Sequence, residues 1–280
     1  MSYIKPHSDD AFSLDTDATL NLGKELQEAH LAASPFPHTV IDDFLPQEVI
    51  DYCKAHFPSS IGREGESFDR NQERYKSSFS PDELEPALRR LFYTFNSRPF
   101  VRIIENITGI KGLIPDPYFM GGGFHEIRTG GHLSVHVDFN HHKPMDLERR
   151  VNLLIYLNDD WQADYGGQLE LWNEDMSACK QSIVPIANRA ALFTLSETSY
   201  HGNPQPVAHP DGVSRKSIAL YYYTATWDET RRALTTQFKP RKGTADKVDW
   251  SIKTDQILQE YLPPFIARKA INLHHKLAKR

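Results

Sequence analysis

The stretch that decides the fold runs from Gly121 to Asp138 and reads GGGFHEIRTGGHLSVHVD. Two of its side chains, His136 and Asp138, are potential metal ligands two residues apart. On a β-strand this spacing puts both side chains on one face. Together with a second imidazole, for which we select His201, they can cap one face of an octahedral metal ion and leave three positions open.

Context separates this His-x-Asp triplet from two others in the chain. His7-Ser8-Asp9 lies in a polar N-terminal segment without apolar periodicity. His209-Pro210-Asp211 is split by a proline and followed by a glycine, which is typical of a turn. Only the triplet at His136 follows a Gly-rich hairpin signal and precedes a strongly β-prone segment. His201 comes 65 residues later (201 − 136), which leaves enough chain for a strand of the opposite sheet to return to the same site.

The composition is that of an ordinary globular chain with one sizeable core. Its 280 residues are 39% hydrophobic and 25% charged, and no apolar run approaches the roughly 20 residues of a membrane span. The net charge of −5 predicts no nucleic-acid partner. The N-terminus lacks a secretory signal, and Cys53 and Cys179 are expected to be reduced thiols, so we expect a cytoplasmic protein. The sequence leaves the oligomeric state open.

We expect three parts along the chain. Residues 1–16 are predicted to be a flexible segment, residues 17–228 the main domain, and residues 229–280 a basic helical extension. That extension would either dock as a terminal helix or offer a basic surface to an anionic partner or membrane face. Within the main domain, a helical cover at 17–110 begins with an amphipathic helix at 17–33. The charged stretch 61–80 is predicted to be a loop, either a lid or a plain surface loop.

The second half of the main domain, about 111–228, is predicted to be β-rich. Short strands separated by turns follow the helical block, which favours an α+β class with a mainly β core, a double-stranded β-helix or jelly roll. The stretch RVNLLIYLN (150–158) is nearly continuously apolar, as expected of a strand covered on both faces. The other expected strands span 124–128, the segment around His136, 168–172, 181–186, 189–195 and 215–226.

Arg215 is the candidate anion-binding residue. In the segment SRKSIA (214–219), strand alternation places Arg215, Ser217 and Ala219 on one face. A guanidinium and a hydroxyl two residues on can hold a carboxylate by charge-assisted hydrogen bonds. The apolar residues that follow indicate burial, and a buried arginine requires an anion.

These motifs resemble the Fe(II)/2-oxoglutarate-dependent dioxygenase superfamily, in particular its prolyl-4-hydroxylase-like branch. The resemblance extends from about Phe36 to Thr226 and rests on His136-x-Asp138, His201, Arg215-x-Ser217, Gly130-Gly131, Tyr156-Leu157-Asn158 and Gly166-Gly167-Gln168-Leu169. It implies that the His, Asp and His bind Fe(II), that Arg215 binds the distal carboxylate of 2-oxoglutarate, and that Tyr156 assists it, with O2 as the second co-substrate.

The chain departs from that branch at two places. Ile127 stands nine residues before His136, where the branch commonly has tyrosine. Arg215 follows His201 by 14 residues (215 − 201), a longer spacing than usual, which we interpret as a loop insertion at 202–213. Both departures weaken any transfer of substrate specificity, although neither removes a ligand.

The resemblance implies an oxidoreductase, a hydroxylase that couples decarboxylation of 2-oxoglutarate to succinate and CO2 with hydroxylation of a C–H bond. The substrate is open: a prolyl or other protein side chain, a free amino acid, a sugar or a specialised metabolite. Two alternatives are a non-catalytic jelly-roll module that retains a metal, and a cupin-type metalloenzyme that does not use 2-oxoglutarate. Candidate substrate-pocket residues are His125, Arg128, His132, Asn140, Asn152 and Trp172.

Overall fold

The computed structural model describes residues 2–58, 66–228, 230–231, 233–241, 243–244, 246, 254, 266 and 269, and of residues 66–70 only the backbone. The chain divides into two compact units, Met1–Phe238 and Lys239–Arg280. All elements described below belong to the first unit, which carries the candidate site.

Five short α-helices belong to this unit within the described residues. They are α1 (Thr16–Thr19), α2 (Gln27–Ala32), α3 (Gln47–Ala55), α4 (Pro86–Phe95) and α5 (Arg98–Thr108), with 3-10 turns at Lys24–Leu26, Pro81–Glu83 and Ala163–Tyr165. The start of α4 illustrates why a helix forms here: Pro86 occupies its first turn, and the Glu85 carboxylate accepts hydrogen bonds from the backbone N–H groups of Ala87 and Leu88.

The strands are mostly short and antiparallel. They are β1 (Pro6–His7), β2 (Asp10–Leu14), β3 (His38–Ile41), β4 (Glu66–Arg70), β5 (Glu73–Phe79), β6 (Ile114–Pro115), β7 (Gly123–Val137), β8 (His141–His142), β9 (Leu147–Tyr156), β10 (Leu169–Trp172), β11 (Cys179–Ile183), β12 (Ala190–Thr194), β13 (His201–Asn203), β14 (Arg215–Thr224) and β15 (Gln237–Phe238).

One curled sheet holds most of these strands, in the order β11-β10-β13-β7-β14-β9-β12-β3. Strands β5 and β15 pair with β7, β4 with β5, β6 with β14, and β8 with β9. Strand β7 is long enough to pair with β14 through its first half and with β13 near its end. The predicted double-stranded β-helix is confirmed; the start of β14 pairs within the first half of β7, and β13 pairs near the end of β7.

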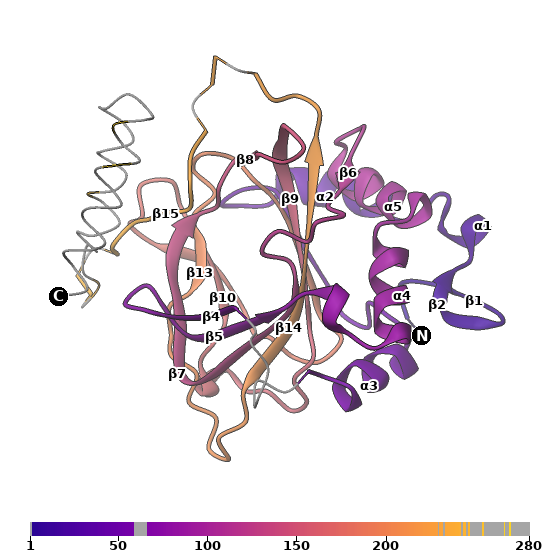
Figure 1. Cartoon of the computed structure of the whole chain (residues 1–280), viewed down its shortest axis with the longest axis horizontal. Helices are drawn as coiled ribbons and strands as arrows, with labels where there is room; N and C mark the ends of the chain where they lie inside the picture. Colours follow the sequence, from indigo (N-terminus) through magenta and orange to yellow (C-terminus); the bar gives the residue numbers. More distant parts are fainter. Residues whose placement is uncertain are drawn as a thin grey trace. The chain divides into compact units, whose positions relative to one another are not determined.

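Strands β9 and β14 pack against the helices with one face and line the inside of the curled sheet with the other. Val151, Leu153 and Ile155 on β9, with Ile218 and Leu220 on β14, pack into the main core with residues of α3, α4 and α5. Figure 1 shows these helices gathered on one side of the strands. The intervening residues of both strands face the inside of the curled sheet, where they include the buried polar side chains of Asn152 and Ser217.

The N-terminal region differs from expectation. The segment expected to be flexible, residues 1–16, contains a packed hairpin: Ile4 is 1% exposed and belongs to the main core, and Phe12 of β2 packs edge-on against Tyr52. A few apolar side chains suffice to attach this segment because each meets the helical layer. The helix expected at 17–33 is interrupted at residues 20–26, where Asn21 and Gly23 are weak helix formers.

The stretch expected to be a loop at 61–80 contains a β-hairpin instead. Strand β5 pairs with β4 on one side and with the whole first half of β7 on the other. Along β5, Ser77 and Phe79 are buried, as alternate residues of a strand should be. Charged residues in the same segment hide this alternation in the sequence. Because β7 would otherwise have an open edge, the hairpin completes its backbone hydrogen bonding.

The boundary of the first unit lies at Phe238 rather than at residue 228. Strand β15 pairs with β7, with Phe238 opposite His136. The helical character expected of the rest of the extension falls largely on residues outside the described ones. None of the helices in the described part of the chain is long and apolar enough to cross a membrane.

A buried histidine joins the helical layer to the sheet. His30 of α2 is fully buried, and its ring nitrogens lie 2.9 Å from the Thr39 hydroxyl of β3 and 3.1 Å from the Thr194 hydroxyl of β12. Burial, reinforced by the neighbouring His38, lowers the pKa of His30 from 6.5 to about 4. The neutral imidazole is therefore the form that stabilises the fold.

This shift predicts an acid-sensitive contribution to stability. Between pH 6.5 and about 4 the unfolded chain binds a proton at His30 that the folded chain does not, so the free energy of unfolding falls as the pH falls. At pH 5 the loss is on the order of 2 kcal/mol. Urea unfolding of wild type and His30→Gln at pH 7.5 and pH 5 should give a smaller pH dependence for the variant, whereas replacing the exposed His56 should leave it unchanged.

Candidate metal centre and co-substrate site

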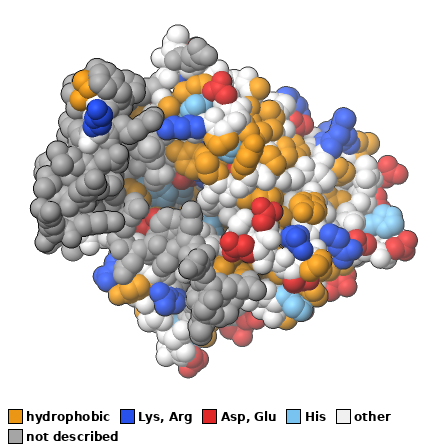
Figure 2. Space-filling view, viewed as in Figure 1, with side chains coloured by type: hydrophobic (Ala, Val, Ile, Leu, Met, Phe, Trp, Pro, Cys, Tyr) orange, Lys and Arg blue, Asp and Glu red, His pale blue; other side chains and the backbone are white. Residues whose placement is uncertain are grey.

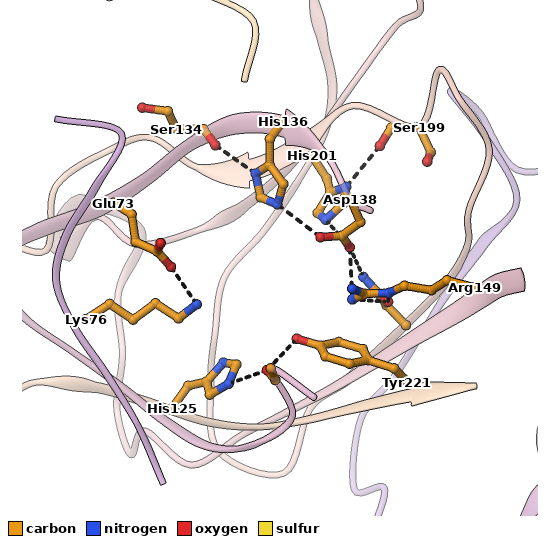
Figure 3. A network of polar contacts seen from close by, with 12 residues as sticks. Glu73, Lys76, His125, Ser134, His136, Asp138, Arg149, Ser199, His201 and Tyr221 are labelled. Atoms are coloured by element: carbon orange, nitrogen blue, oxygen red, sulfur yellow. Dashed lines mark hydrogen bonds and ion pairs between the residues drawn. The ribbon is translucent and has the colours of Figure 1, made fainter. Parts of the chain in front are cut away.

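Three potential ligands converge inside the curled sheet. His136 lies near the end of β7, Asp138 directly follows that strand, and His201 begins β13, where it is the cross-strand partner of His136. One ligand atom from each residue can be chosen so that all lie within 4.8 Å of one another. Figure 3 shows the three side chains pointing toward one another. The spacing predicted from the sequence thus places these side chains in one cluster.

Hydrogen bonds fix both imidazoles in the orientation that a metal requires. Nδ1 of His136 lies 2.8 Å from the carbonyl oxygen of Ser134, and Nδ1 of His201 lies 2.9 Å from that of Ser199. Because a carbonyl only accepts, each Nδ1 donates, and in the neutral ring Nε2 keeps its lone pair. Burial lowers the pKa of His201, which favours this neutral form.

The close approach of β13 to β7 depends on Gly202. A Cβ atom at this position would lie 2.9 Å from the carbonyl oxygens of Leu133 and Ser134. Any larger residue would therefore push β13 away from β7 and separate His201 from His136. The small residue next to the distal ligand is a requirement of the ligand geometry.

The ligand atoms of the cluster lie close enough together to bind one ion. Nε2 of His136 lies 3.5 Å from Oδ1 of Asp138, and Nε2 of His201 lies 3.3 Å from Oδ2. Two imidazole nitrogens and one carboxylate thus form a compact set of donor atoms. Such a donor set fits a divalent transition metal with open positions, so the residues present fit Fe(II).

Asp138 has two further partners: Asn152, which the sequence named only as a candidate pocket residue, and Arg149, which it did not single out. Oδ2 accepts a hydrogen bond of 2.7 Å from Nδ2 of Asn152 and lies 3.1 Å from Nη2 of Arg149. The Arg149 guanidinium also donates from Nε and Nη2 to Oδ1 of Asn152, at 3.1 and 2.9 Å. Burial by itself would raise the pKa of the Asp138 carboxyl, but the neighbouring Arg149 guanidinium holds it well below its usual range. The carboxylate is therefore ionised and able to bind a cation.

Arg215, Ser217 and Tyr156 form a second buried group in the same interior. Ser217 pairs across strands with Tyr156, and the Arg215 guanidinium carbon lies 5.0 Å from the centre of the Tyr156 ring. All three are at least 96% buried, with Arg215 4% exposed. Nε of Arg215 donates to the carbonyl oxygen of Gly167 at 2.7 Å. Gly167 has a φ of +71°, and a Cβ there would lie 2.8 Å from Cδ of Arg215, so glycine is needed at this contact.

This group is incomplete without an anion. Within the described part of the chain, no carboxylate lies within ion-pairing distance of Arg215, and burial lowers the pKa of its guanidinium. Among the residues that the structure describes, none forms a hydrogen bond with the buried Tyr156 hydroxyl. A buried cation beside an unpaired hydroxyl fits a carboxylate that accepts from both.

Two of the candidate pocket residues lie in the polar network of the ligands. Asn152 binds Asp138 as described above. Nε2 of His125 lies 2.9 Å from the carbonyl oxygen of Gly121, which also accepts from the Tyr221 hydroxyl at 3.0 Å. Burial, with Lys76 nearby, holds the pKa of His125 well below 6.5, so its ring is neutral and its Nε2–H donates.

The remaining candidate pocket residues have other contacts. Arg128 is exposed and lies over the Tyr75 ring at 5.9 Å, while Nε2 of His132 donates to the Asn71 carbonyl oxygen at 3.2 Å. Oδ1 of Asn140 accepts from the backbone N–H of Leu234 at 2.8 Å. Nε1 of Trp172 donates to the Glu170 carboxylate at 2.8 Å. A substrate role for these residues stays a prediction.

Comparison with known proteins agrees with this geometry. The sequence profile of the 2OG-Fe(II) oxygenase superfamily matches residues 122–223. The mouse protein Prolyl 3-hydroxylase OGFOD1 is 26% identical over 221 residues, which cover 72% of this chain and 37% of that protein. The chain thus spans little more than a third of the length of this curated relative.

Solved structures of low sequence identity also match. A Pseudomonas putida prolyl-4-hydroxylase is 17% identical, with a TM-score of 0.49, over 72% of this chain and 98% of that one. A Trichoplax adhaerens prolyl hydroxylase, solved in complex with a hypoxia inducible factor oxygen degradation domain peptide fragment, is 19% identical, with a TM-score of 0.47, over 71% of this chain and 88% of that one.

The ligand cluster predicts the metal stoichiometry. Wild type should bind one equivalent of Mn(II), a redox-stable substitute for Fe(II), in equilibrium dialysis. His201→Ala removes a direct ligand and should weaken binding by more than the roughly 10–100-fold that loss of an outer partner costs. His209→Ala removes the histidine of another His-x-Asp triplet and serves as the control. Retained binding in the first variant with loss in the second would contradict the assignment.

Proposed function

Because residues 122–223 match the sequence profile of the 2OG-Fe(II) oxygenase superfamily, we propose that the protein is a non-haem Fe(II) dioxygenase that uses 2-oxoglutarate and O2 to hydroxylate a C–H bond. The observation that carries this proposal is the pairing of two incomplete groups in one interior: a lone-pair cluster that requires a cation, and a buried arginine that requires an anion. A dicarboxylate co-substrate that binds both a metal and Arg215 satisfies the two requirements together.

In this proposal each side chain has a definite role. Fe(II) bound by His136, Asp138 and His201 would supply the activation of O2 and the decarboxylation of 2-oxoglutarate to succinate and CO2. Arg215, with Ser217 and the Tyr156 hydroxyl, would hold the distal carboxylate and thereby orient the co-substrate. The buried aromatic and aliphatic residues around Tyr156 would exclude water from the reacting atoms.

For the substrate, we propose a prolyl side chain presented on a peptide. Support comes from the curated relative named as a prolyl 3-hydroxylase. Figure 2 also shows hydrophobic side chains gathered over β6, β8 and the segment after β6, in which Tyr118 is 62% exposed. The same segment joins the ligand network, because the Gly121 carbonyl accepts hydrogen bonds from His125 and Tyr221. An apolar surface beside the site suits a proline-containing peptide better than a sugar.

The reaction class can be tested without knowing the substrate. Protein reconstituted anaerobically with Fe(II) and then supplied with 2-oxoglutarate and O2 should form succinate slowly, and His136→Ala should form none above background. Proline-containing peptides should accelerate succinate formation, whereas free proline should not. Metal binding with no 2-oxoglutarate binding in calorimetry would instead support the cupin-type enzyme or the metal-retaining module.

Arg215 provides a sharper test of the co-substrate assignment. Arg215→Met should raise the Kd for 2-oxoglutarate of the Mn(II)-loaded protein about 10–100-fold, because charge-assisted hydrogen bonds to the distal carboxylate are lost. Mn(II) affinity itself should stay the same. Lys216→Met is the matched control, since the neighbouring side chain points to the other face, over the Phe57 ring. A variant that loses only affinity for the peptide would place Arg215 in the substrate site.

A further inference from the structure

One oxygen of the Asp138 carboxylate is held by the protein and the other is not. Oδ2 accepts from the Asn152 amide at 2.7 Å and lies 3.1 Å from the Arg149 guanidinium, besides the 3.3 Å contact with Nε2 of the ligand His201. For Oδ1, the polar neighbour that the structure gives within the described residues is Nε2 of the other ligand imidazole, His136, at 3.5 Å, so no donor outside the ligand cluster holds this oxygen. The two oxygens of the carboxylate are thus chemically different before any metal binds.

The residues that hold Oδ2 are themselves held rigidly. The Arg149 guanidinium carbon lies 3.7 Å from the centre of the Tyr221 ring and 4.3 Å from that of the Phe139 ring, so two aromatic rings pack against this group. Its side chain is 2% exposed, and Asn152 is 3% exposed. The Asn152 amide binds the arginine through its oxygen and Asp138 through its nitrogen, so the three side chains form a closed triangle of hydrogen bonds.

A β-bulge points Arg149 into this triangle. Val151 of β9 pairs with Tyr222 of β14. The next residue of β14, Tyr223, pairs with Arg149, so Arg150 is skipped and has no partner on β14. Residues 149 and 152 would lie on opposite faces of a regular strand. The extra residue reverses the alternation, so that Arg149 shares a face with Asn152, whereas Arg150 turns outward to Glu148 and Thr224.

From this geometry we propose that Arg149 and Asn152 are positioning residues that hold Oδ2 of Asp138 so that the carboxylate binds the metal through Oδ1 alone. The inference rests on the proposed metal centre. Its consequence concerns the open coordination positions: a carboxylate that bound through both oxygens would occupy one of the positions that a chelating co-substrate and O2 need. Fixing one oxygen to the protein keeps that position available.

Orientation can be separated from charge by comparing two variants. Asn152→Ala removes the shortest hydrogen bond to Oδ2 and the anchor of Arg149 without changing the charge of the site. Arg149→Met removes the second donor together with its positive charge. Arg150→Met removes the same kind of side chain from the adjacent position, where it is directed outward, and is the matched control.

The experiment determines crystal structures of the Mn(II) complexes and measures 2-oxoglutarate affinity by calorimetry on the same Mn(II)-loaded proteins. In wild type and Arg150→Met, Asp138 should bind Mn(II) through one oxygen. In Asn152→Ala and Arg149→Met it should bind through both, and the Kd for 2-oxoglutarate should rise about tenfold or more. If Arg149→Met does not fold, Asn152→Ala carries the test alone, because it leaves the arginine in the core.

Two results would overturn the proposal. Asn152→Ala with single-oxygen binding and wild-type affinity for 2-oxoglutarate would show that the triangle does not set the coordination mode. An effect confined to Arg149→Met would show that the arginine acts through its charge instead. Failure of the proposed function would look different, because wild type itself would then bind no Mn(II) or no 2-oxoglutarate.

Discussion

A buried, ionised carboxylate places the strictest demand on this structure. The Asp138 side chain is only 12% exposed, and its ionised form is retained because positive charge and hydrogen-bond donors surround it. Arg149 and Asn152 meet part of this demand, and a metal between the imidazoles would meet the rest. Three features position these groups around Asp138: the bulge in β9, the aromatic rings packed on Arg149, and the cross-strand pairing of His136 with His201.

Strands β9 and β14 contribute both to the hydrophobic core and to the site around Asp138. Their outer residues bind the helical layer through the main core, and their inner residues supply Asn152, Tyr156, Arg215 and Ser217. Since one backbone carries both sets, any packing change against the helices shifts the inner side chains as well. A rigid scaffold of this kind suits a site whose groups must keep fixed positions.

Much of this architecture follows from patterns within single segments. The two-residue spacing of His136 and Asp138, and the alternation that pairs Arg215 with Ser217, depend only on strand geometry, so the sequence predicts them. Arg149 was missed because its direction depends on a bulge, which arises from pairing between two strands and leaves no mark in either. The hairpin at 66–79 and the attached N-terminal segment were missed for a similar reason: both are stabilised by contacts with distant strands and helices rather than by their own periodicity.

The two buried arginines of the interior differ in whether the protein itself neutralises their charge. Arg149 and Asp138 carry opposite formal charges at 3.1 Å, so this pair is compensated within the protein. Arg215 is equally buried, but within the described residues no carboxylate pairs with it: its guanidinium donates to a carbonyl oxygen and lies over an aromatic ring. One positive charge therefore remains in excess, and a divalent metal would add two more. An interior of this kind attracts a dianion, and a dianionic co-substrate that reaches both the metal and Arg215 would leave a much smaller charge in the low-dielectric interior.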